Sequence, residues 1–187
     1  QRAVDEQVGQ MNKGLDGMTL SAVLEDNVAV MQNLFADVDV FRVRRLESED
    51  GSLRFALMFC EGMIDCKYVE LSIISPLLSA SVTEGDAADY LVEQTLKVTE
   101  VKRTSDIREI VEGVSYGDTL LFVDGSAQAL LMDTKHFVTR AIAEPESERT
   151  LTGPREGFNE DLITNLTLLR RKVRSNELKM KLRVFGR

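Results

Sequence analysis

Acid–base chemistry near neutral pH most often uses histidine, and this 187-residue chain contains one, His136. A catalytic triad would need its imidazole beside a serine or cysteine nucleophile and an acid that orients the ring. We identify no such nucleophile, and the chain has no Walker A loop, no G-x-G-x-x-G and no H-E-x-x-H. We therefore interpret His136 as a surface or turn residue and predict no catalytic residue and no enzyme activity.

Two groups of carboxylates are candidates for a metal site. Asp124 and Asp133 lie close in sequence, but the Asp-Gly pair that begins at Asp124 is explained by the backbone of a tight turn. Glu61 and Asp65 are about one helical turn apart, but Gly62 between them favours a loop. Because neither group has a predictable third ligand, we predict no metal and no cofactor.

Cys60 and Cys66 are the two cysteines of the chain. Their spacing is neither that of a paired C-x-x-C zinc site nor that of a thioredoxin-like motif. We expect both to be reduced thiols of a cytoplasmic protein.

Charge is divided unevenly along the chain. Residues 151–187 hold nine Lys and Arg against four Asp and Glu, whereas residues 1–150 hold 14 against 27. An acidic body argues against nucleic-acid binding, which needs a cationic surface facing the phosphates. No run approaches the roughly 20 apolar residues that span a bilayer, so we expect a soluble piece of a longer protein.

The side chains that could carry an interaction gather where the acidic body meets the basic tail, between Glu144 and Arg171. Gly153 and Pro154 favour an extended or turned backbone, because proline fixes φ and biases its neighbour away from helix. Gly157 adds a second permissive position. These residues predict a linker over 148–159.

A helix is expected directly after this linker, from Glu160 to Lys172. Asn159 is placed to cap it, acidic residues occupy its first turn and basic residues its last turn. The apolar stripe expected to face a core is Leu162, Leu166, Leu169 and Val173. A strand from Leu178 to Val184 should follow, and it needs a pairing partner.

Residues 153–171, GPREGFNEDLITNLTLLRR, resemble the hallmark of GerA-type spore germinant receptor A subunits, EP..E..IRGPREGFTE...TN..LIRRRI. Residues 116–148, YGDTLLFVDGSAQALLMDTKHFVTRAIAEPESE, are similar to the stretch that precedes this hallmark, and FCEGMID takes the place of a "YidGLvD"-like segment. Departures are local: Thr152 stands where the family usually has Arg, and residues 172–175 replace a commoner RIK-P run. Over residues 21–187 the chain is identified as a member of the GerA/SpoVAF spore germination family.

The candidate site is a subdomain junction built on this hallmark. Arg155 and Glu156 lie between two glycines, and we favour a salt bridge or helix-terminus contact that locks the subdomain angle over ligand binding. Phe158 is expected to fill an apolar pocket, and Asn165 to hydrogen-bond backbone across the junction. The candidate junction residues are Glu144, Pro145, Gly153, Pro154, Arg155, Glu156, Gly157, Phe158, Asn159, Asn165, Arg170 and Arg171.

The resemblance implies the cytoplasmic amino-terminal domain of a receptor A subunit in the inner spore membrane, facing the spore core. Its implied partners are the B and C subunits of a complex that responds to nutrient germinants, and its implied role is assembly or signal coupling. A SpoVAF-like paralogue and self-association through the tail strand remain open. The alternative function is a small-molecule binding module with a cleft between two subdomains near residues 153–159.

The body that must position this junction alternates helices and strands. One helical face is formed by Leu24, Val28, Met31 and Phe35. Further helices are expected over 66–80, interrupted at Ser75-Pro76, over 86–96 and over 107–114, and strands over 37–46, 53–59, 98–103, 119–123, 129–132 and 137–143.

This order predicts an α/β or α+β fold with a mixed β-sheet flanked by helices. The expected organisation is a flexible lead over 1–18, an acidic mixed α/β body over 19–147, the linker over 148–159, and a helix and strand of a second, truncated subdomain over 160–187.

Overall fold

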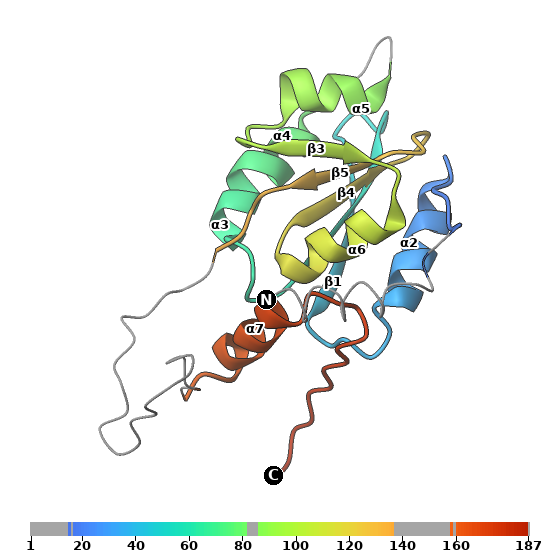
Figure 1. The fold of residues 1–187 in the computed structure, drawn as a ribbon. Coiled ribbons are helices and arrows are strands. Elements are labelled where there is room, and N and C mark those ends of the chain that lie inside the picture. Colours follow the sequence, from blue (N-terminus) through green and yellow to red (C-terminus); the bar gives the residue numbers. More distant parts are fainter. Residues whose placement is uncertain (1–14, 16, 82–85, 137–157, 159, 187) are drawn as a thin grey trace.

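A single five-stranded sheet organises the computed structural model, which describes residues 15, 17–81, 86–136, 158 and 160–186. The strand order is β1-β2-β4-β5-β3, and all four neighbouring pairs are antiparallel (Figure 1). The strands are β1 (Phe41–Glu47), β2 (Arg54–Cys60), β3 (Val101–Thr104), β4 (Thr119–Val123) and β5 (Ala129–Met132).

Both faces of the sheet are buried, and the alternation of side chains along β2 shows how. Ala56 and Met58 belong to one hydrophobic core, whereas Phe55 and Leu57 belong to the other. Helices α2 (Leu24–Leu34) and α6 (Ile107–Tyr116) contribute to the first core. The helices that contribute to the second core are α3 (Cys66–Val69), η2 (Glu70–Ile74), α4 (Ser75–Leu78), α5 (Ala87–Tyr90) and η3 (Leu91–Thr95).

Helix α6 has clear sequence determinants at both ends. The Asp106 side chain accepts a hydrogen bond from the backbone N–H of Arg108, and Gly117 ends the helix at φ 105°. Its apolar face is fully buried against the sheet and consists of Ile107, Ile110, Val111 and Val114.

The predicted class, α/β or α+β with helices flanking a sheet, is confirmed by these layers. The sheet was expected to be mixed, whereas every pairing of its described strands is antiparallel. Hairpins join β1 to β2 and β4 to β5, with φ of 69° at Gly51 and 89° at Gly125 in the two turns. The one parallel contact among the described residues is an isolated bridge between Val38 and Met180.

Two local predictions were wrong. The helix over 66–80 is not interrupted at Pro76, because the π-helical turn η2 leads directly into α4, where proline occupies the first turn and needs no intrahelical N–H donor. The segment from Leu178 to Val184 does not form a strand, since Met180 alone pairs, with Val38.

Several predictions fall outside the described residues. They are the lead over 1–18 except Leu15, Gly17 and Met18, the strand over 137–143, and the linker over 148–159 except Phe158.

Candidate functional site

Helix α7 (Leu162–Lys172) lies against the turn that follows β2. The turn contains Gly62 at φ 83°, and a Cβ added there would lie 2.4 Å from Cγ2 of Ile163. The hydroxyl of Thr167 donates to the backbone oxygen of Ile163 at 2.8 Å and lies 3.4 Å from that of Gly62. Glycine at position 62 is therefore what allows the helix to approach this closely.

After α7 the chain passes beside the body, and its last residues then point away from it (Figure 1). The amide of Asn176 donates to the backbone oxygen of Leu34 at 3.2 Å. Around the Met180 bridge, the N–H of Asp39 donates to Met180 at 2.8 Å and the N–H of Met180 donates to Asp37 at 3.0 Å. Side chains and backbone therefore both hold the tail to the segment between α2 and β1.

Arg170 is the most deeply buried charged side chain in α7, at 1% exposure. Its Nη2 donates to the backbone oxygen of Leu178 at 2.9 Å, but Nε and Nη1 have no partner within the described part of the chain. Burial lowers the pKa of Arg170. Burial also raises the pKa of the Cys60 thiol to about 11, and the Arg170 charge opposes this only in part.

The buried face of α7 differs from the predicted leucine stripe. Leu162 is 57% exposed and Leu169 is 40% exposed, while Thr167 and Arg170 are buried. Leu166 is the member of the expected stripe that packs on the core. The turn at Gly62 admits the Thr167 face of the helix, so tertiary fit outweighs the apolar pattern.

The predicted junction residues divide in two groups. Asn165, Arg170 and Arg171 lie in α7. Phe158 precedes the helix and is 70% exposed, so the packing of Phe158 into an apolar pocket is not seen within the described residues. The cap of α7 is Asp161, whose side chain accepts from Ile163 and Thr164. The remaining candidates lie outside the described residues: Glu144, Pro145, Gly153, Pro154, Arg155, Glu156, Gly157 and Asn159.

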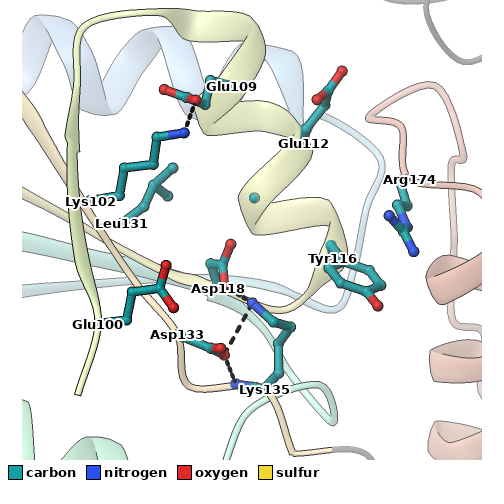
Figure 2. Close-up of a pocket in the computed structure, with 11 residues that line it drawn as sticks. Glu100, Lys102, Glu109, Glu112, Tyr116, Asp118, Leu131, Asp133, Lys135 and Arg174 are labelled. Carbon is teal, nitrogen blue, oxygen red and sulfur yellow. Dashed lines mark hydrogen bonds and ion pairs between the residues drawn. The ribbon is translucent and has the colours of Figure 1, made fainter. Parts of the chain in front are cut away.

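A pocket of about 440 Å³ adjoins this junction (Figure 2). It brings together side chains from β3, α6, the turns around β4 and β5, and Arg174 of the tail. Its lining consists of Glu100, Lys102, Glu109, Glu112, Gly113, Tyr116, Asp118, Leu131, Asp133, Lys135 and Arg174.

Lys135 is the centre of charge pairing in the pocket. It forms ion pairs with Asp118 and with Asp133, the latter at 3.0 Å. Burial lowers the pKa of Lys135, but its bonds to the two aspartates outweigh this and raise it overall. Burial raises the pKa of Asp118, and the negative charges of Asp133 and Glu100 add to this, so Lys135 compensates only partly.

A serine motif that is present at the end of α6 was not identified from the sequence. Residues 113–117 read G-V-S-Y-G and match the G-x-S-x-G pattern of a nucleophile elbow. That elbow is a turn between a strand and a helix, whereas Ser115 lies in the last turn of α6. Its Oγ is buried with no hydrogen-bond partner among the described residues, so the arrangement is not that of an activated nucleophile.

The carboxylates considered as metal ligands have other partners. Asp124 accepts from the N–H of Leu24 and pairs with Arg54, and the hydrogen bond from Leu24 is the main cause that lowers its pKa. Glu61 pairs with Arg42 at 2.5 Å. In the part of the chain that the structure describes, no three His, Cys, Asp or Glu side chains could together hold a metal ion.

Comparison with known proteins gives this junction a family context. The sequence profile described as "Bacillus/Clostridium GerA spore germination protein" matches residues 29–187. The chain belongs to the GerA spore germination protein family. Its resemblance to GerA-type A subunits is thereby confirmed.

Individual GerA relatives have low sequence identity to this chain but align with most of its length. Spore germination protein KA of Bacillus subtilis (strain 168) is 28% identical over 161 residues, which cover 85% of this chain and 30% of that protein. Stage V sporulation protein AF of the same organism is 27% identical over 146 residues, which cover 77% and 29%. The chain therefore spans about three tenths of the length of these relatives.

The fold also matches a solved GerA-type structure. The crystal structure of the N-terminal domain of the A subunit of the Bacillus megaterium spore germinant receptor GerK3 superposes with a TM-score of 0.65 at 18% identity. The match covers 85% of this chain and 58% of that one. None of the helices in the described residues has the length and hydrophobicity of a bilayer-spanning helix.

Proposed function

We propose that this chain is part of the amino-terminal domain of a spore germinant receptor A subunit and acts in assembly or signal coupling, without a catalytic step. The observation that carries the coupling role is the two-sided packing of α7. Thr167 and Arg170 pack on the body, while Leu162 and Leu169 of the same helix are exposed. A helix with one docked face and one open apolar face can pass a change in its position from one part of a protein to another.

The match to GerK3 supports this role because the chain covers 58% of that N-terminal domain. We infer that the open face of α7 and the apolar tail residues Val184 and Phe185 contact the remaining part of such a domain. The second subdomain that begins near residue 160 remains our prediction.

The cellular setting is likewise a proposal. We place the parent protein in the inner spore membrane, with this domain on the cytoplasmic side, and B and C subunits as its partners. The relative YfkQ of Bacillus subtilis (strain 168), 26% identical over 161 residues, is described as a membrane protein, which supports a membrane-bound parent. The alternative, a binding cleft near residues 153–159, lies outside the described residues.

The test is to prevent α7 from docking in the full-length protein. Gly62→Ala places a Cβ 2.4 Å from Ile163 at a positive φ. Gly125→Ala is the matched control, since it has φ 89° but no atom within 4 Å of an added Cβ.

In spores with equal receptor levels, we expect Gly62→Ala to slow nutrient-triggered germination and Gly125→Ala to leave it near wild type. Normal germination in the Gly62→Ala spores, together with demonstrated undocking of α7, would contradict the coupling role.

A further inference from the structure

The pocket beside the tail carries more negative charge than its own cations neutralise. Five carboxylates and three basic side chains line it. Two of the basic side chains are engaged: Lys102 with Glu109, and Lys135 with Asp118 and Asp133. The side-chain carboxylates of Glu100 and Glu112 make no ion pair or hydrogen bond with any described residue. The lining therefore has two carboxylates whose charge is not paired within it.

A cation already occupies the rim of this pocket. The guanidinium carbon of Arg174 lies 3.7 Å from the ring centroid of Tyr116, and Nζ of Lys135 lies 5.5 Å from it (Figure 2). An aromatic face attracts ammonium and guanidinium groups within about 6 Å of its centroid. Arg174 is exposed and belongs to the tail, so this cation can leave the ring without the sheet or α6 moving.

We propose that the pocket binds a small organic cation, an ammonium or guanidinium compound, which replaces Arg174 on Tyr116. Glu112 and Glu100 supply the compensating negative charge, and Leu131 offers apolar contact to a carbon chain. The volume of about 440 Å³ is sufficient for a molecule of this size. A metal ion does not fit, because no suitable ligand triplet exists among the described residues.

Displacement of Arg174 has a structural consequence for the tail. Arg174 lies between the end of α7 and Asn176, which holds the tail to Leu34. Loss of its stacking on Tyr116 removes one of the contacts that seat this segment. The effect on signalling rests on the coupling role proposed above, whereas binding itself does not.

The test uses agmatine, which carries a guanidinium and an amine, titrated by calorimetry at constant ionic strength. Arg174→Gln removes the internal competitor, so we expect agmatine to bind several-fold more tightly than to the wild type. Arg183→Gln removes the same charge from an exposed tail position that does not line the pocket, and should bind as the wild type does. Equal affinities for the two variants, or no saturable binding to either, would overturn the proposal.

Two further variants separate the ring from the fold. Tyr116→Phe keeps the aromatic face and should retain binding, while Tyr116→Leu should lose most of it. Should Tyr116→Leu not fold, Glu112→Gln takes its place, with weaker agmatine binding expected. Binding of the uncharged N-butylurea as tightly as agmatine would refute recognition of a cation.

Hydrogen exchange then reports on the tail. Faster exchange of residues 173–182 in the agmatine complex supports displacement of Arg174, and unchanged exchange with agmatine bound refutes it. Neither readout involves germination, so failure here is distinguishable from failure of the Gly62→Ala test.

Discussion

Burial of Arg170 between α7 and the body lowers the stability of the fold. Its guanidinium is buried, yet two of its three nitrogens lack partners among the described residues. A buried charge costs several kcal/mol of desolvation, and replacing even a well-paired buried ion pair by apolar side chains of similar volume is often neutral or stabilising by about 1–4 kcal/mol.

We therefore expect Arg170→Met to leave the free energy of unfolding unchanged or to raise it by up to about 3 kcal/mol, as measured by urea denaturation. Arg183→Met is the exposed control, with a change within about 0.5 kcal/mol. A loss of more than about 2 kcal/mol in Arg170→Met would instead mean that the bond to Leu178 anchors the tail.

Asp118 makes stability depend on pH. Burial raises the pKa of its carboxyl above the ordinary value of 3.8, so the folded state holds its proton to higher pH than the unfolded state does. The contribution of Asp118 to stability is therefore largest below that value and declines as pH rises through the raised pKa.

We expect the unfolding free energy of the wild type to fall relative to that of Asp118→Asn as pH increases from about 3.5 upward. The reason is that only the wild type must ionise a buried carboxyl. Chemical denaturation at a series of pH values measures this. Lys135 keeps its pairing with Asp133 in the variant. A wild type that instead gains stability relative to Asp118→Asn as pH rises would show that the ion pair with Lys135 outweighs the cost of burying the Asp118 carboxylate.

Helix α7 depends on its cap, because its buried face is small and partly polar. The Asp161 side chain accepts from two backbone N–H groups at the helix start, those of Ile163 and Thr164, each at 3.2 Å. Loss of an N-cap costs about 0.5–2 kcal/mol.

Asp161→Ala should thus accelerate hydrogen exchange in α7, with α6 unaffected. Glu160→Ala is the matched control, since it removes the same charge one residue earlier without removing the cap. Equal acceleration in both variants would mean that charge near the helix dipole, rather than capping, is responsible.

Elements whose signals are local could be predicted from the sequence. Asp106, the apolar spacing after it and Gly117 define α6, and continuous apolar runs define β4 and β5. The face that α7 buries could not be predicted, because it is selected by the shape of the turn at Gly62 rather than by the leucine spacing.

The pocket could not be predicted either. Its residues run from Glu100 to Arg174 and meet only because α6 packs across β5 and the tail returns beside Tyr116. No fixed spacing connects them, so no motif describes them. The predicted strand over 178–184 was wrong for a related reason. Alternation of apolar and polar residues cannot show whether a neighbouring strand is available for pairing.

The bridge between Val38 and Met180 also sets how the molecule responds to force. It joins the entrance of β1 to a segment that follows α7, through two hydrogen bonds between the same short stretches of backbone. The N–H of Leu182 also donates to Oδ2 of Asp39 at 2.6 Å, and Lys181 pairs with Asp37. A pull on the chain beyond Leu182 therefore loads these two contacts first and the Val38–Met180 bridge next, all close to the edge strand of the sheet. Because α7 precedes these contacts along the chain, we expect a pull on the tail to break them before it disturbs the packing of α7 against Gly62.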